Sequence, residues 1–154
     1  MGRLAPATIR AKTFIQGLWL RGLDWDAPLA DNDRDRWCNF VHDLAALEKV
    51  RVSRWMRLSG LREVEIHGFA DASERAYAAV VYFRTRSNSA SSWTVALVVA
   101  KTKVSPLKQV SLPRLELCAA VLLVRLVAHV RGLLDLQGKS IHLWSDSTVT
   151  LGWI

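Results

Sequence analysis

The chain has little cysteine, and its two cysteines stand far apart. Cys38 and Cys118 are separated by most of a domain's length, and the sequence has neither a C-x-x-C pair nor a cluster of cysteine with histidine. This spacing argues against a disulfide framework and against a cysteine-based metal site. Both residues fall within apolar, helix-like runs, so we expect buried free thiols in a reducing compartment.

Long apolar segments are also absent. The longest mostly apolar stretch, Leu115–Val124, which contains Glu116, is too short to cross a bilayer. Met1 is followed by Gly2, Arg3 and Leu4, and not by the apolar stretch of a signal peptide. We therefore expect a soluble, intracellular protein with no membrane partner.

Acidic residues are in the minority. The chain carries 21 lysine and arginine residues against 14 aspartate and glutamate residues, which gives a net charge of +7. Basic chains often bind phosphate groups, although many do not, so the charge leaves a nucleic-acid partner open without deciding it. With 154 residues, 51% of them apolar, the chain has the size of one ordinary domain, or of a small domain with an appendage.

Helical periodicity marks the first part of the chain. It predicts a helix over 8–21 that is ended by Gly22. A second helix is expected to begin at Asp31 or Asn32, both of which are favoured N-cap residues. Its apolar stripe predicts core packing. The pattern changes near Ser59-Gly60, which indicates a boundary between two parts.

Strand patterns follow from residue 64 onward. The expected elements are, in order, strands over 64–71, 76–84 and 93–104, a helix from about 112 to 134, a strand over 140–146, and the start of a helix that runs to 154. Ser111 as a cap and Pro113 in the first turn indicate where the long helix begins. The polar stretch 86–92 is expected to be a hairpin loop. Strands and helices in this order indicate an α+β or α/β fold.

Three acidic residues stand where this arrangement brings segments together. Asp71 ends the first expected strand, Asp146 ends the fourth, and Glu116 falls on the apolar arc of the long helix at 100° per residue. If strands one and four lie side by side beneath the helix, the carboxylates converge and repel one another. Mg²⁺ or Mn²⁺ ions, which prefer oxygen ligands, would relieve that repulsion. Two such ions about 4 Å apart can activate a water and stabilise the leaving oxygen of a phosphodiester.

Each of these residues taken singly has a plainer interpretation. Asp71 and Asp146 can be ordinary turn or helix-cap residues. Glu116 can be a solvated glutamate that the helix dipole favours near a helix start. The three residues together, and not any one of them, favour a metal site.

Three segments carry a resemblance to a known family. Residues 67–73 (HGFADAS), 111–120 (SLPRLELCAA) and 143–154 (LWSDSTVTLGWI) resemble the RNase H region of retroelement polyproteins. The chain is most similar to the BEL/Pao class of LTR retrotransposons, in the region often labelled Pao retrotransposon peptidase. Residues 11–29 also resemble the connection that follows the reverse transcriptase in those polyproteins.

The resemblance implies two parts and a fold. Residues 1–60 would be a helical connection or thumb-like segment of a reverse transcriptase, and 61–154 an RNase H-like domain. The family fold is a mixed five-stranded sheet with flanking helices. It continues, after the helix that begins near Ser147, with a fifth strand and a final helix that carries a fourth carboxylate. We therefore expect 61–154 to be incomplete at its C terminus, which puts the activity of this chain in question.

The resemblance also implies an activity. Asp71, Glu116 and Asp146 would be catalytic metal ligands that hold two Mg²⁺ (or Mn²⁺) ions and cut the RNA strand of an RNA–DNA hybrid. The partners would be that hybrid and the reverse transcriptase part of the same polyprotein, in the cytoplasm, a virus-like particle or the nucleus. Residues expected to contact nucleic acid, with solvated surface positions as the alternative, are Ser73, Lys101, Lys103, Arg114 and Ser147.

Two alternatives to a nuclease stay open. Retroviral-type aspartic proteases use D-T-G or D-S-G, whereas the segments 71–73 (DAS) and 146–148 (DST) lack the glycine. The long helix between these segments also suits an all-β protease poorly. The other alternative is a non-catalytic scaffold that packs on a reverse transcriptase through its tryptophan-rich N-terminal helices.

Overall fold

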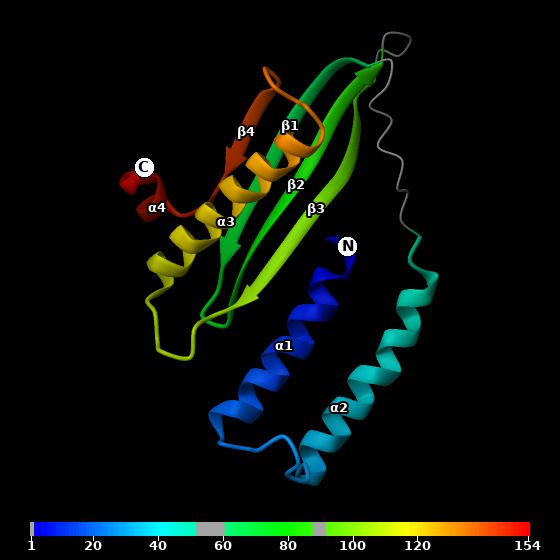
Figure 1. The fold of residues 1–154 in the computed structure, drawn as a ribbon, viewed down its shortest axis with the longest axis vertical. Helices are drawn as coiled ribbons and strands as arrows, with labels where there is room; N and C mark the ends of the chain where they lie inside the picture. Colours follow the sequence, from blue (N-terminus) through cyan, green and yellow to red (C-terminus); the bar gives the residue numbers. More distant parts are fainter. Residues whose placement is uncertain (1, 52–60, 88–91) are drawn as a thin grey trace.

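A mixed four-stranded sheet forms the centre of the computed structural model, which describes residues 2–51, 61–87 and 92–154 (Figure 1). The strands are β1 (Leu61–Ala72), β2 (Ala76–Ser87), β3 (Thr94–Val104) and β4 (Ser140–Trp144). The helices are α1 (Ala5–Leu20), α2 (Asp31–Leu44), α3 (Leu112–Leu133) and α4 (Thr148–Trp153), with short 3-10 turns η1 (Gly2–Leu4) and η2 (Ala45–Lys49). The boundary expected near Ser59-Gly60 and most of the polar loop expected over 86–92 lie outside the described residues.

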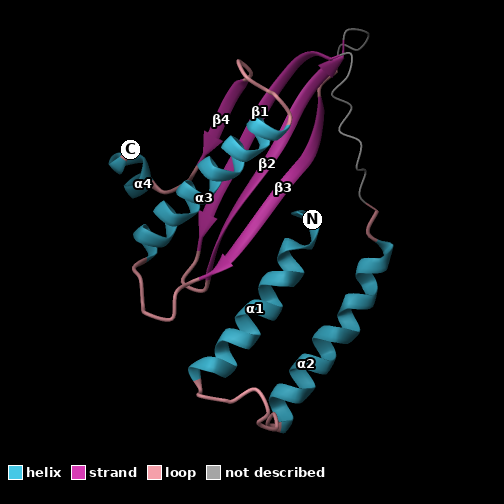
Figure 2. Cartoon of the chain, in the orientation of Figure 1, coloured by secondary structure: helices cyan, strands magenta, loops and turns pink. Residues whose placement is uncertain are grey.

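The strand order is β3-β2-β1-β4. Antiparallel pairing joins β1 to β2 and β2 to β3, whereas β1 and β4 run parallel. Parallel strands need a long crossover connection, and here it contains β2, β3 and α3. The combination of a mixed sheet with flanking helices, visible in Figure 2, confirms the fold class expected from the sequence.

One face of the sheet packs against α3. Alternate residues of the strands are buried there, and Ile66, Val81 and Phe83 have no exposed surface. Facing them, α3 buries a stripe at helical spacing: Leu115, Ala119, Leu122, Leu123, Leu126, Val127 and Val130. The helix approaches β1 so closely at Gly68 that a Cβ atom there would lie 2.6 Å from Leu123 Cδ1. The core of the chain therefore lies between α3 and the sheet.

The opposite face is covered only in part. The turn η1 lies on β3, where a Cβ atom on Gly2 would come within 2.7 Å of the Ala100 backbone nitrogen. Helix α1 continues along β3, and Gln16 Nε2 donates to the Ser105 carbonyl at 2.5 Å. Toward β1 and β4 this face keeps large side chains in solvent, as the exposed Phe69 and Trp144 show.

Helix α2 packs on α1. The Trp37 ring, part of the stripe predicted for core packing, stacks on Phe14 of α1 at 5.3 Å between centroids. Arg21, at the end of α1, pairs at 2.7 Å with Asp33, which is buried in the first turn of α2. An aromatic stack and an ion pair thus hold the two helices together.

Several local expectations needed correction. Helix α1 begins at Ala5, earlier than residue 8. Helix α2 begins at Asp31 as expected, but its N-cap residue is Ala30, so the expected cap by Asp31 or Asn32 was wrong. Cys38 and Cys118 are exposed free thiols and not buried ones. Cys118 lies one residue before the fully buried Ala119, so the 100° step of the helix moves it out of the buried stripe. No helix in the described ranges is long and apolar enough to span a membrane.

Candidate functional site

The parallel pairing of β1 with β4 places two of the predicted acids. The register runs from Glu65 opposite Ser140 to Phe69 opposite Trp144. Asp71 and Asp146 each lie two residues beyond this last pair, so they follow the same end of neighbouring strands. Both side chains are exposed. The condition stated from the sequence, that strands one and four lie side by side, is therefore met in the structure.

Glu116 reaches the same region from α3. It lies in the first turns of the helix and is half-buried at the edge of the buried stripe. Its Oε2 atom accepts a short hydrogen bond from the Ser147 hydroxyl. Ser147 is itself buried, caps α4 and accepts a hydrogen bond from the Thr150 amide at 3.1 Å. The residue next to Asp146 is thus tied directly to Glu116.

The three carboxylates do not form a tight cluster. Among the described residues they are not a group whose oxygen atoms all lie within 4.8 Å of one another. Asp71 lines a groove of about 410 Å³ on the sheet face opposite α3, together with Phe69, Tyr82 and Arg3. Its Oδ1 atom accepts from the Ala72 amide at 2.7 Å. Asp71 therefore approaches the end of the sheet from one face, and Glu116 approaches it from the other.

The donor set suits hard divalent cations. Three carboxylates offer only oxygen ligands, and two of them are exposed at one end of the sheet. Oxygen donors of this kind are what Mg²⁺ and Mn²⁺ take in proteins. The residues present therefore fit the metal chemistry expected from the sequence.

The residues predicted to contact nucleic acid fall in several places. Ser73 closes the β1–β2 turn, where its hydroxyl donates to the Ala76 carbonyl at 3.1 Å. Lys101 and Lys103 are exposed on β3, and their pairing with Ala79 and Tyr77 puts them on the same sheet face as α3. Arg114 is exposed at the start of α3. Ser147 is buried against Glu116, so its hydroxyl serves that contact in this structure.

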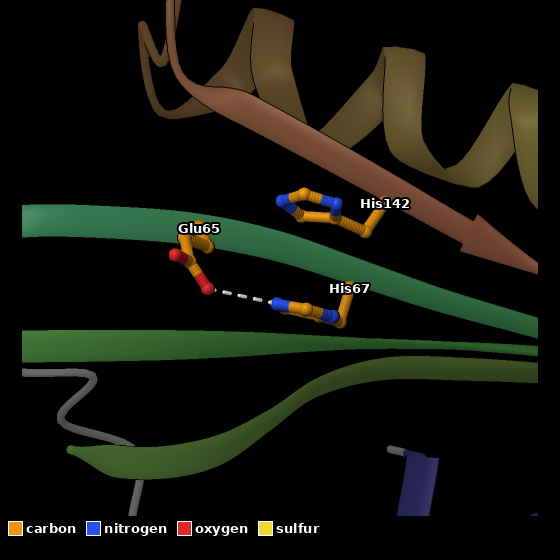
Figure 3. Close-up of side chains that lie close together, drawn as sticks. All are labelled: Glu65, His67 and His142. Atoms are coloured by element: carbon orange, nitrogen blue, oxygen red, sulfur yellow. Dashed lines mark hydrogen bonds and ion pairs between the residues drawn. The ribbon is translucent and has the colours of Figure 1, made fainter.

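A second group of polar side chains was missed by the sequence analysis. The group consists of Glu65 and His67 on β1 and His142 on β4 (Figure 3). One ligand atom of each residue lies within 4.8 Å of the other two, and no other such group occurs in the described part of the chain. The Glu-x-His spacing on an expected strand was a visible signal for the first two. His142 joins them only through the parallel register, which the sequence does not specify.

The chain matches the family described as "Pao retrotransposon-like RNaseH-like domain" over residues 1–147. This match takes in the N-terminal helices, the whole sheet and the segment that carries Asp146 and Ser147. No curated protein and no solved structure gave a match. The match agrees with the mixed sheet, its flanking helices and the acids at the ends of β1 and β4. The chain therefore belongs to the family of Pao retrotransposon-like RNase H-like domains.

Proposed function

We propose that this chain is the RNase H-like part of a retroelement polyprotein and that it hydrolyses the RNA strand of RNA–DNA hybrids. The observation that carries the proposal is the parallel register, which brings Asp71 and Asp146 to the same end of adjacent strands. Glu116 supports it, because its carboxylate is tied to Ser147, the residue that follows Asp146. By the same resemblance, residues 1–60 are the helical connection that follows a reverse transcriptase, and residues 61–154 are the nuclease part.

In this proposal Asp71, Glu116 and Asp146 hold the metal ions. Bound Mg²⁺ would supply activation of the attacking water and stabilisation of the leaving oxygen. The chain's own contribution is placement. Pairing with β2 fixes the backbone of Asp71, and α3 fixes that of Glu116. The hydrogen bond from the Ser147 hydroxyl orients the Glu116 carboxylate. Such prior placement lowers the cost of bringing charged groups together at the moment of reaction.

The charges around the sheet support a nucleic-acid substrate. The net charge of +7 attracts a polyanion. Lys101 and Lys103 project from the face of β3 that α3 also occupies, and Arg125 on α3 is close enough to Tyr77 of β2 to influence it electrostatically. We propose that these cations contact phosphates, and that the exposed rings of Phe69 and Trp144 are available for stacking on the other face.

The test is cleavage of a labelled RNA–DNA hybrid in Mg²⁺ or Mn²⁺. Cleavage that depends on the metal and is lost in Asp71→Asn supports the proposal, because the substitution removes a charge needed to hold the ions. Glu74→Gln is the matched control, since Glu74 is an exposed acid three residues along the chain and is assigned no role. Equal cleavage by wild type and Asp71→Asn would overturn the assignment of Asp71.

The same experiment separates the alternatives. Hybrid binding without cleavage would favour a scaffold, which the exposed Trp19 and Trp25 of the N-terminal part support as an interface. Cleavage of peptides that is blocked by an aspartic-protease inhibitor would favour the peptidase. The 22-residue helix α3 between the two aspartates gives that reading no support.

A further inference from the structure

Two histidines and a glutamate meet on the sheet face opposite α3. Glu65 and His67 are two residues apart on β1, so both project from the same face. His142 lies directly opposite His67 in the parallel register of β4. The two imidazole rings stack with centroids 4.8 Å apart and planes at 19°. Figure 3 shows the three side chains lying together, with Glu65 and His67 on one strand and His142 on the next. One ligand atom from each of the three residues lies within 4.8 Å of the other two.

The surroundings keep Glu65 ionised and leave it one oxygen for a further ligand. His67 Nε2 and Arg84 Nη1 both contact Oε2 of Glu65, each at 3.0 Å, whereas Oε1 takes part in neither contact. The hydrogen bond from His67 lowers the pKa of the Glu65 carboxyl from its ordinary value of 4.5, with help from Arg84 and against the opposing effect of burial.

Arg84 is the one cation that these contacts bring to the group. Its guanidinium lies over the Trp93 ring at 4.0 Å from the centroid, so its position is also fixed by an aromatic partner on the far side of β2 from Glu65. Arg84 therefore neutralises the Glu65 carboxylate from β2, through the same oxygen atom that His67 contacts. A dication bound by Glu65, His67 and His142 would be held by two imidazole nitrogens as well as by the carboxylate charge.

We propose that Glu65, His67 and His142 form a binding site for Zn²⁺, with water as a fourth ligand. Two imidazoles and one carboxylate are a donor set that zinc takes in proteins, with bonds of about 2.0–2.2 Å. Imidazole ligands also select zinc over Mg²⁺, which binds oxygen. This site is therefore chemically distinct from the carboxylates at the ends of β1 and β4.

Binding of zinc at this site would require the three side chains to move, but not the backbone. Tetrahedral bonds of about 2.05 Å place ligand atoms about 3.3 Å apart, so the three atoms must close up from their present separations. His142 is exposed and can tilt its ring toward His67. Zinc would also displace the proton that His67 shares with Glu65. The backbone pairing of the two strands already sets the positions from which the side chains start.

An ion at this position would link β1 to β4. The strand β4 is short, and within the described residues it pairs with β1 alone. Bound zinc would add a second connection between the same two strands, ahead of Asp71 on one and Asp146 on the other. The site would thus stabilise the strand pair on which the placement of those acids depends.

The experiment is a Zn²⁺ titration of the full chain, first treated with a chelator, by isothermal titration calorimetry. We expect one Zn²⁺ per chain and a loss of affinity of more than about 100-fold in His67→Asn and in His142→Asn, because even the outer partners of a metal site are worth 10- to 100-fold. His42→Asn and His129→Asn are the matched controls, since they replace the chain's two other histidines and should bind as wild type does. A large excess of Mg²⁺ should not displace the zinc.

Two further measurements guard against misfolded variants. Co²⁺ bound to the wild-type chain should give the intense visible absorption of a tetrahedral site, and this needs no substitution. Zn²⁺ should raise the thermal midpoint of wild type and of His129→Asn but not that of His142→Asn. Zinc binding that is unchanged in both His67→Asn and His142→Asn, or an octahedral Co²⁺ spectrum in the wild-type chain, would overturn the proposal.

Discussion

Ser147 connects two features that the sequence presents separately. Its hydroxyl donates to the Glu116 carboxylate and accepts from the Thr150 amide, and so it both positions an acid and caps α4. In Ser147→Ala both bonds are lost. Loss of the N-cap alone should lower the free energy of unfolding by about 1 kcal/mol. The total decrease should be larger, because the half-buried Glu116 also loses its hydrogen-bond partner. Urea denaturation measures the change.

Ser111 provides the control for this prediction. It is the N-cap residue of α3 by position, but its side chain makes no capping hydrogen bond. Ser111→Ala should therefore change the unfolding midpoint much less than Ser147→Ala. Ser147→Thr keeps the hydroxyl and should recover most of the stability. Equal effects of the two alanine substitutions would show that the Ser147 bonds contribute little.

Tyr77 should make the stability of the chain sensitive to alkaline pH. Burial raises the pKa of its phenol above the ordinary 10.0, with a further contribution from Cys118 and an opposing one from Arg125. Because the folded-state pKa is the higher one, the unfolded chain releases this proton first. The stabilising contribution is complete below pH 10 and is lost as the pH rises through the folded-state pKa.

Tyr77→Phe isolates that contribution. The variant should lose less stability than wild type between about pH 9 and pH 11, because phenylalanine has no proton to release. Unfolding midpoints measured across this range give the difference between the two curves. Parallel curves for wild type and variant would contradict the prediction.

At the scale of elements, α3 packs closely on β1 at Gly68. A Cβ atom at Gly68 would lie 2.6 Å from Leu123 Cδ1 and 3.1 Å from Leu143 Cδ2, so the Leu123 side chain would have to move. In Gly68→Ala we expect a loss of about 1–3 kcal/mol, the usual cost of overpacking a core. Adding Leu123→Val, which shortens the nearer side chain, should recover part of that loss.

A second glycine gives the opposite expectation. Gly17 lies inside α1 and would place its Cβ atom in open space. Gly17→Ala should therefore stabilise the chain by about 0.5–1 kcal/mol, because alanine has the higher helix propensity. Thermal or urea unfolding of both variants tests the pair. A stabilising Gly68→Ala would show that α3 can move away from β1 at little cost.

The sequence predicts the helices and strands more closely than it predicts which of them pack together. The helical period of α3 and the apolar runs of β1 to β3 are local patterns, and the structure has these elements within a few residues of where the patterns predict them. The position of Glu116 at the edge of the buried stripe also followed from the 100° step. Cys118 belonged to the same pattern, but its apolar neighbours led to a prediction of burial that was wrong.

Contacts between distant segments could not be predicted from local sequence patterns. The parallel register of β1 and β4 depends on packing against α3 and not on any local signal. For this reason the meeting of His142 with His67, and the bond from Ser147 to Glu116, were not predicted. The resemblance to a family supplied the roles proposed for Asp71 and Asp146, since each residue taken singly also had a plainer interpretation.

At the scale of the whole molecule, the excess of positive charge should appear in the salt dependence of binding to an RNA–DNA hybrid. Each phosphate neutralised by a cation contributes about 0.9 to the slope of log K against log salt concentration for duplex DNA. If Lys101 and Lys103 contact phosphates, the double variant Lys101→Gln/Lys103→Gln should lower that slope by about 2. The double variant Lys49→Gln/Lys139→Gln removes the same charge from exposed sites outside β3 and is the control. This control variant lowers the long-range attraction equally but removes no proposed phosphate contact, so the slope of log K against log salt concentration should stay near that of wild type. Slopes that fall equally in the two double variants would show that net charge, and not the face of β3, determines binding.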